Sequence, residues 1–430
     1  MTSRKFLFLS FTLVFVALLN SACGERNATV ASASPSAALE TATSADAEIN
    51  AVLKVIEKKP DSPTGYNQLA VVYIKKARET GDFSLNAKAE TAVDKALAIA
   101  PDDAATNNLK ASLHLTFHRF REALELGTKL QKTNPKDPFV YGVLTDANVE
   151  LGNYEQAVEA GQTMVDLKPN MSSYARVSHL RSLHGDTDGA VEAMRTAARI
   201  ADPMDKEAQS WCLARMGDEL WKIGKYAEAE RVYDEALTNF PNYHLALAGK
   251  GRARAAQNDL AGAVKFLTDA NNRVPNVETT ILLGDVYTKL GDAEKAKQQY
   301  DLVEVIEQKI GSSSDQKRLA LLWADQNVRL DEALEITKRE YQARKDIYTA
   351  DAHAWILYKK GRLDEAKTAM DAAMRLKTKD ALFFYHAGMI AKDAGDKKEA
   401  RKMLESALKI NPAFDLIQAE NARRALSELQ

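Results

Sequence analysis

Apolar residues recur at spacings of three and four along most of the chain, in pairs of short stretches separated by a turn signal. In one pair, Leu213, Met216 and Leu220 fall on one face of a helix, and Gly224 follows them. Glycine accepts the left-handed conformation that ends many helices, so Gly224 predicts the end of the first helix. A second apolar stretch follows and ends before Pro241. The pattern predicts hairpins of two amphipathic helices.

These hairpins recur with a fixed period. Prolines stand at positions 101, 135, 169 and 203, each 34 residues after the last, and again 34 residues apart at 241 and 275. Such a period is typical of stacked repeats, because a single helical hairpin cannot bury its apolar face alone. The sequence therefore predicts an all-α protein, an α-solenoid of about ten stacked helix-turn-helix repeats.

Composition and motifs narrow the function. The formal net charge of −2 over 430 residues argues against a nucleic-acid surface, which usually needs a basic excess. The chain has no Gly-rich phosphate loop, CxxC pair or G-x-S-x-G turn. His114 and His118 stand four apart on one predicted helix, but no third ligand accompanies them, which favours packing over metal binding. We expect no enzymatic activity, no metal and no cofactor.

One unit shows the full repeat pattern. It contains large residues, small residues, a turn glycine, an aromatic residue and a closing proline in the order Leu213, Met216, Gly217, Leu220, Gly224, Tyr226, Ala229, Tyr233, Ala236, Pro241. The last unit, from Phe384 to Pro412, follows the same order. This pattern resembles the tetratricopeptide repeat family over about residues 62 to 412. The resemblance implies a solenoid with a concave groove that receives segments of other proteins.

The N-terminus has the features of an export signal. Arg4 and Lys5 precede an uncharged apolar run, Phe6 to Leu19, which is short for a membrane span. The residues up to Cys23 resemble a bacterial lipoprotein signal, which implies lipidation of Cys23. Asn20 stands where that family prefers an aliphatic residue. Cleavage after Ala22 without lipidation and an uncleaved anchor are the alternatives.

Composition and the repeat period together divide the chain into six parts. The predicted parts are a signal peptide (1–22), a lipid-anchored flexible tether rich in Ala, Ser and Thr (23–45), an N-terminal capping helix (46–61), repeats 1–7 (62–310), repeats 8–10 (311–412) and a C-terminal capping helix (413–430). Residues 311–314, Gly-Ser-Ser-Ser, interrupt the repeat phase and predict a bend. The expected location is the periplasmic face of the cell envelope, with lipid anchoring to the outer membrane.

The candidate partner-binding residues form a second stripe on the first helices. In the family, the corresponding positions line the concave groove. They are Trp211, Asp218, Trp221, Arg252, Asp285, Trp355, Tyr358 and Tyr385. Aromatic residues there suit the anchoring of a partner. The alternative is that the tryptophans pack against the neighbouring first helix.

Three of these residues share one repeat position. Asp218 and Arg252 are 34 residues apart, and Asp285 follows after 33. Equivalent positions on stacked units lie side by side, so they predict an acid–base–acid row along the groove. With Trp211 and Trp221 beside it, the row would suit a basic or aromatic ligand segment.

The leading hypothesis is a non-enzymatic protein-binding scaffold of the bacterial cell envelope. Its expected partners are other proteins, with membrane contact through the N-terminal lipid anchor and no nucleic acid. The alternative is an accessory or regulatory subunit of a polysaccharide-export or envelope-enzyme machinery.

Overall fold

The computed structural model describes residues 35–310 and 316–429. These residues form 22 α-helices and one short 3-10 helix, and none of them belongs to a strand. The predicted signal peptide, Cys23, the first part of the predicted tether and the predicted bend at 311–314 lie outside the described residues.

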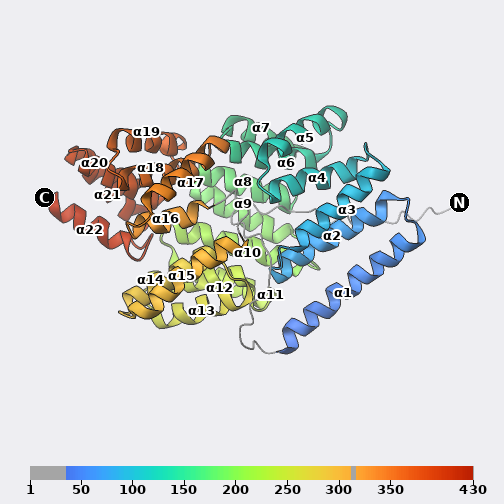
Figure 1. Ribbon diagram of the computed structural model, residues 1–430, viewed down its shortest axis with the longest axis horizontal. Coiled ribbons are helices and arrows are strands. Elements are labelled where there is room, and N and C mark those ends of the chain that lie inside the picture. Colours follow the sequence, from blue (N-terminus) through green and yellow to red (C-terminus); the bar gives the residue numbers. More distant parts are fainter. Residues whose placement is uncertain (1–34, 311–315, 430) are drawn as a thin grey trace.

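The helices alternate as the repeat pattern predicts (Figure 1). The first helices of the ten hairpins are α2 (Pro63–Thr80), α4 (Ala104–Thr116), α6 (Pro138–Leu151), α8 (Met171–Leu183), α10 (Lys206–Lys222), α12 (His244–Ala256), α14 (Val277–Lys289), α16 (Lys317–Asp325), α18 (Ile347–Lys359) and α20 (Ala381–Asp393). The second helices are α3 (Leu85–Ile99), α5 (Phe120–Thr133), α7 (Tyr154–Leu167), α9 (Thr187–Ile200), α11 (Tyr226–Asn239), α13 (Leu260–Arg273), α15 (Ala293–Ile310), α17 (Leu330–Ala343), α19 (Leu363–Ala373), which η1 (Met374–Leu376) continues, and α21 (Lys397–Ile410). The predicted all-α solenoid is confirmed.

Local sequence explains where the helices begin and end. Gly152 ends α6 with a φ of 78°, and its backbone N–H donates to the carbonyls of Asn148 and Val149. Residues that have a Cβ rarely adopt this left-handed conformation. The carboxylate of Asp137 accepts a hydrogen bond from the Phe139 amide and caps the start of the same helix. Within a hairpin, Gly217 lies against the Tyr233 ring, where any Cβ would overlap it. Small residues at this position therefore set the close spacing of the two helices.

A helix precedes the first repeat and another follows the last. Helix α1 (Pro35–Lys58) packs on α2, and α22 (Gln418–Glu428) packs on α20 and α21. Helix α1 begins at Pro35 rather than at residue 46, so the expectation of a flexible tether is corrected for residues 35–45. Alanines at 37, 38, 42 and 45 favour helix, and proline is well suited to the first helical position.

The solenoid curls until its second superhelical turn contacts its first. The Tyr154 hydroxyl, at the start of α7, accepts a hydrogen bond from the Ile347 amide at 2.9 Å. Two repeats further on, the Tyr226 hydroxyl donates to Asn411 Oδ1 and accepts from the Ala413 amide at 3.1 Å. We call this contact between superhelical turns the seam, defined by Tyr154 and Tyr226 on one side and Ile347, Asn411 and Ala413 on the other. Figure 1 shows α17 and α18 returning beside α7 and α8.

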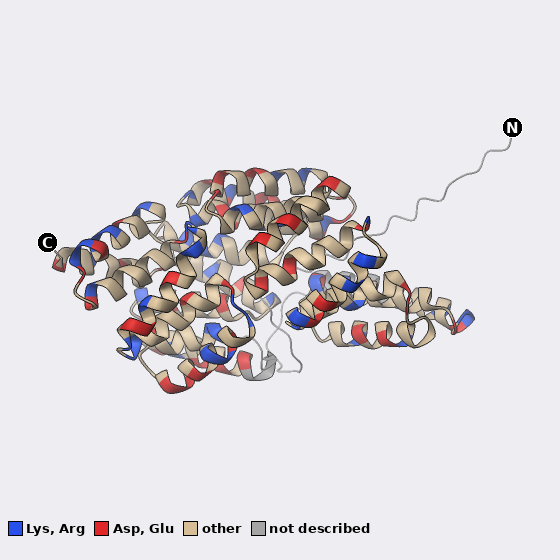
Figure 2. Ribbon diagram, turned by 90° about the horizontal axis from the view of Figure 1, so that it is seen from above, with Lys and Arg blue, Asp and Glu red and all other residues tan. Residues whose placement is uncertain are grey.

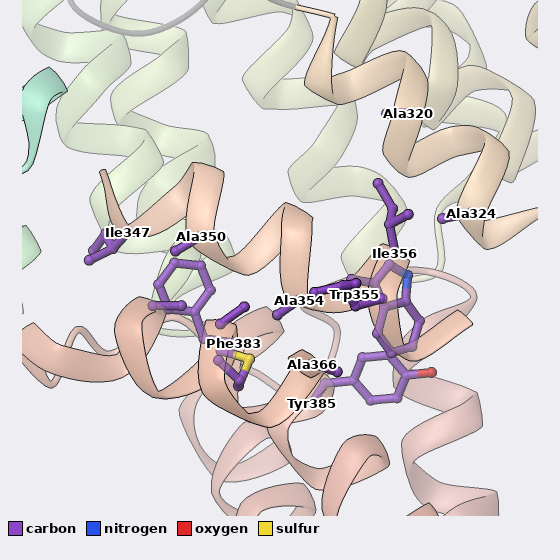
Figure 3. Packing of buried hydrophobic residues seen from close by; sticks show 14 of the residues in the cluster. Ala320, Ala324, Ile347, Ala350, Ala354, Trp355, Ile356, Ala366, Phe383 and Tyr385 are labelled. Atoms are coloured by element: carbon purple, nitrogen blue, oxygen red, sulfur yellow. The ribbon is translucent and has the colours of Figure 1, made fainter. Parts of the chain in front are cut away.

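The seam also carries ion pairs and apolar packing. Arg344 pairs with Glu150, 194 residues away in sequence, and both side chains are buried. The largest apolar cluster continues across the seam, from Val149 and Leu183 to Ile347 and Trp355. Figure 3 shows part of this cluster around α18 and α20. The seam therefore joins the two superhelical turns along one side of the interior of the solenoid.

Charges are spread over the whole surface. Lysine and arginine alternate with aspartate and glutamate along most helices in Figure 2. Among the described helices, none combines the length and the apolar character that a membrane crossing requires.

Candidate functional site

The interior of the solenoid contains a cavity of about 420 Å³. Most of its lining comes from first helices of repeats that lie far apart in sequence. The lining includes Arg78, Glu150, His179, Glu207, Trp211, Arg215, Asp218, Glu219, Trp221, Lys222, Tyr243, His244, Arg252, Glu278, Arg344 and Tyr348. The cavity is thus the concave side of the solenoid, reduced in size by the curl.

Asp218 is the centre of a hydrogen-bond network on the cavity wall. Its carboxylate accepts hydrogen bonds from Arg215 Nη1 at 2.9 Å and from the Tyr233 hydroxyl at 2.9 Å. Arg252, from the next repeat, also donates to it. Burial raises the pKa of the Tyr233 hydroxyl, and the Asp218 carboxylate raises it further. The predicted pairing of Asp218 with Arg252 is confirmed.

Both predicted tryptophans of repeat five line the same cavity, and each lies beside an arginine. The Arg252 guanidinium lies 4.4 Å from the centre of the Trp221 ring, and that of Arg215 lies 5.8 Å from the Trp211 ring. Trp211 is buried with 8% of its surface exposed, whereas Trp221 is half-buried. Within residues 35–310 and 316–429, the indole N–H of Trp221 has no hydrogen-bond partner. Trp211 is therefore part of the core, and Trp221 presents more of its surface to the cavity.

The remaining polar groups of the wall are mostly paired. Glu207 accepts from the Tyr243 hydroxyl at 2.8 Å and lies 3.4 Å from Arg78 of repeat one. Burial lowers the pKa values of His179 and His244 to about 4, so both imidazoles are uncharged at neutral pH. The charges of the wall therefore reside on carboxylates, arginines and lysines that largely neutralise one another.

Asp285 does not complete the predicted row. No ion pair joins it to Arg252 among the described residues, and its carboxylate accepts a hydrogen bond from Tyr300 at 2.7 Å. Burial raises its pKa well above the ordinary value, and the nearby carboxylates of Asp415 and Asp325 raise it further. The acid that lies near Arg252 on α14 is instead Glu278. The prediction of an acid–base–acid row is wrong at its third member, because the segment before α22 returns to cover α14.

The three predicted residues of repeats nine and ten form a separate aromatic cluster. Trp355 and Tyr385 are each 2% exposed, with ring centres 5.5 Å apart, and Figure 3 shows the two rings side by side. The His386 ring stacks on the Trp355 ring with the ring centres 4.1 Å apart. The Tyr358 ring also stacks on Trp355, with the ring centres 4.9 Å apart. The indole N–H of Trp355 donates to Asp325 at 2.8 Å. None of the three lines the cavity, so their assignment to an open groove is corrected.

Sequence reasoning missed two kinds of residue. Arg215 stands three residues before Asp218 on the same helix, a spacing that places them side by side and could have revealed the pair. Arg78 and Glu150 reach the cavity wall through the superhelical curl, for which the repeat pattern holds no signal. In the described part of the chain, no group of three or more His, Cys, Asp or Glu side chains is arranged to hold a metal ion.

Comparison with known sequences identifies the repeats. Profiles of the tetratricopeptide repeat family match residues 215–276, and a second set of such profiles matches residues 278–303 and 381–414. These segments of the chain are tetratricopeptide repeats. As in that family, the repeats indicate a scaffold for protein–protein interaction. No curated protein sequence gave a significant match to the chain.

Solved structures of other repeat proteins are similar to this chain at low sequence identity. Yeast Tom70 is 14% identical, with 91% of this chain and 94% of that chain covered and a TM-score of 0.39. A tetratricopeptide repeat protein from Parabacteroides merdae is 18% identical, with 60% and 98% covered and a TM-score of 0.35. The human IFIT1 dimer with PPP-AAAA is 15% identical, with 85% and 87% covered and a TM-score of 0.46.

Proposed function

We propose that this protein is a non-enzymatic scaffold of the bacterial cell envelope that takes a segment of a partner protein into its central cavity. The observation that carries the proposal is the meeting of Trp211, Trp221, Asp218 and Arg252 on one wall of one cavity. Aromatic and arginine side chains in a recessed site are the groups that most often anchor a protein partner.

The wall favours an aromatic or apolar side chain of the partner over a basic one. A basic residue would need a free carboxylate, and the Asp218 carboxylate is already shared by Arg215, Arg252 and Tyr233. The Trp221 ring is half-buried, and it offers an apolar face. The expected ligand segment is therefore aromatic rather than basic, which narrows the expectation drawn from sequence.

A crosslinking experiment on intact membranes tests the cavity. We expect Trp221→Ala to remove the partner proteins that the wild-type protein captures, because the substitution deletes the aromatic face. Phe266→Ala is the matched control, since Lys250 lies 4.6 Å from the Phe266 ring centre and this residue on α13 does not line the cavity. Equal capture by wild-type protein and Trp221→Ala would place the partner surface elsewhere.

The anchor is tested separately. The expectation that Cys23 follows an export signal and is lipidated places the protein on the periplasmic face of the envelope, anchored to the outer membrane. We expect Cys23→Ser to release the mature protein from membranes, and intact mass of the wild-type N-terminus to show an acylated Cys23. A membrane-bound Cys23→Ser protein would contradict lipidation at this residue.

A further inference from the structure

The cavity is too small for a long partner segment in the state described. Its volume of about 420 Å³ lies at the lower end of the 300–1,000 Å³ that small-molecule sites occupy. Residues of the seam or next to it, such as Tyr154, Arg344 and Asn411, form part of its wall. The same contacts that join the two superhelical turns therefore limit the space beside Trp221.

Besides its ion pair and apolar packing, the seam has a few polar contacts at helix ends. Tyr154 accepts the amide hydrogen of Ile347, the first residue of α18. Asn411 follows α21, accepts from Tyr226 and donates from Nδ2 to the Trp221 carbonyl at 3.0 Å. Both tyrosines are the first residues of second helices. Tyr154 binds the first residue of repeat nine, and Tyr226 binds the segment between repeat ten and α22. The seam thus links the repeat that carries Trp221 directly to the C-terminal end of the solenoid.

One position differs between the early and the late repeats. Two residues after the turn position, repeats one, two, three and five carry aromatic residues, namely Phe83, Phe120, Tyr154 and Tyr226. Repeats four, six, seven, nine and ten carry Thr187, Leu260, Ala293, Leu363 and Lys397 there. Aromatic residues at this position therefore lie in the first half of the solenoid, and two of them, Tyr154 and Tyr226, form the seam; repeat four contacts the second superhelical turn without one, through the Leu183 carbonyl and Thr378.

The turn glycines differ in what lies beside them. A Cβ on Gly152 would overlap the Lys345 carbonyl, and one on Gly185 would lie 2.7 Å from the Lys377 carbonyl. At Gly291, Gly361 and Gly395, a Cβ would meet nothing within 4 Å. All five have similar positive φ angles, so the backbone requirement is shared, whereas among these five only Gly152 and Gly185 are approached closely by the second superhelical turn.

We propose that the seam is a latch: it holds the superhelix closed over the cavity and must part before a partner segment can occupy it. The role of the latch in admitting a partner rests on the proposed function. The opening of the seam does not, because it depends on this chain alone. The apparent affinity of a ligand that binds only the open state is its intrinsic affinity multiplied by the open fraction, so the latch sets the apparent affinity.

Hydrogen exchange tests the latch without any partner. In a concerted opening, Ile347 loses its acceptor Tyr154 and Ala413 loses its acceptor Tyr226, because both tyrosines move away with the first superhelical turn. The Ala413 amide then keeps only its local hydrogen bond to Asn411 Oδ1 at 3.0 Å. Tyr226→Phe removes only the hydroxyl that serves Asn411 and Ala413. We expect it to accelerate exchange about fivefold at Ala413 and also at Ile347, the change that one lost hydrogen bond produces in an opening equilibrium.

The control removes the same group outside the seam. Tyr300→Phe deletes a hydroxyl that bonds Asp285 and Thr288 within repeat seven, so exchange at Ile347 and Ala413 should match the wild type. Acceleration confined to Ala413 in Tyr226→Phe, or no acceleration at either amide, would overturn the latch. Acceleration of both amides by Tyr300→Phe would also overturn it, because general loosening would then explain the effect.

A glycine pair supplies a second and independent test. Gly152→Ala and Gly361→Ala carry the same backbone strain, since their φ angles are 78° and 72°, but only Gly152 faces the second superhelical turn. We expect Gly152→Ala to accelerate exchange at Ala413 at least tenfold more than Gly361→Ala does. Equal exchange in the two variants would contradict the latch.

The two proposals fail in different experiments. If exchange at both amides rises together but Trp221→Ala still captures partners, the latch stands and the partner site is elsewhere. If Trp221→Ala loses partners while exchange at the two amides is uncoupled, the cavity site stands and the latch is wrong.

Discussion

Repeats five and nine carry predicted groove residues at the same two repeat positions, but these residues lie in different surroundings. Six residues before the turn glycine, repeat five has Asp218 and repeat nine has Trp355; three residues before it, they have Trp221 and Tyr358. In repeat five these positions face a cavity. In repeat nine Trp355 is 2% exposed and stacks on His386.

Equivalent positions differ in burial because the superhelix places different neighbours beside the two repeats. Repeat five faces the hollow centre of the solenoid, whereas repeat nine is covered by repeat ten, whose Tyr385 ring centre lies 5.5 Å from that of Trp355. Position within a repeat therefore decides which way a side chain points, and position within the superhelix decides whether it meets space or protein.

The largest expected effect is on Trp355. Trp355→Ala should lower the free energy of unfolding by about 3–5 kcal/mol, because it removes a buried ring with aromatic neighbours on several sides. Urea denaturation followed by circular dichroism measures the loss. Trp355→Phe keeps an aromatic ring and removes the hydrogen bond to Asp325, so its loss should be smaller. A near-native midpoint for Trp355→Ala would show that repeat nine is not packed as described.

A smaller effect is expected at Asp285, and its sign depends on pH. Burial and the Asp415 carboxylate raise the pKa of Asp285 above 3.8 in the folded protein, so the folded state holds this proton more tightly than the unfolded state. The resulting stability is complete below that value and is lost as pH rises through the raised pKa. Asp285→Asn should therefore stabilise the protein by about 1 kcal/mol near neutral pH and flatten the decline in melting temperature that follows as pH rises above 3.8.

Asp218→Asn is the matched variant for that prediction. The same substitution at the same repeat position should destabilise, because it deprives Arg215 and Arg252 of their shared carboxylate. Stabilisation by both variants would mean that Asp218 is not neutralised by the two arginines.

The smallest effect is expected for the stability of Trp221→Ala. The half-buried ring contributes its contact with Arg252 and partial packing, so the unfolding free energy should fall by about 1 kcal/mol. Thermal melting of Trp221→Ala and Trp355→Ala under the same conditions compares the stability that each substitution removes. Equal losses in the two variants would mark Trp221 as core and remove the distinction between the repeats.

The fold could be predicted from the sequence because the same helix-turn-helix pattern recurs in every repeat. The 34-residue spacing, the turn glycine and the small residues at close contacts each recur, and neighbouring repeats must stack whatever lies farther away. For the same reason the pairing of Asp218 with Arg252 could be predicted, since it joins equivalent positions of adjacent units.

Contacts between superhelical turns could not be predicted from the repeat pattern. Asp285 responds to Asp415, and Glu150 pairs with Arg344, across separations of more than a hundred residues. The curl that brings them together is the sum of small rotations at each repeat, and no single repeat encodes that sum. The burial of Trp355 and Tyr385 follows from the same curl.

The seam also fixes the number of repeats. A solenoid in which each unit contacts only its neighbours can gain or lose a unit by duplication or deletion with little change to the remainder. Here Tyr154 contacts Ile347, and Tyr226 contacts Asn411. The same number of repeats separates the two residues of each pair. Deleting one hairpin between them would bring a different connection opposite every seam residue at once. Evolution of this chain is therefore expected to tolerate change at its two ends and to preserve its middle length.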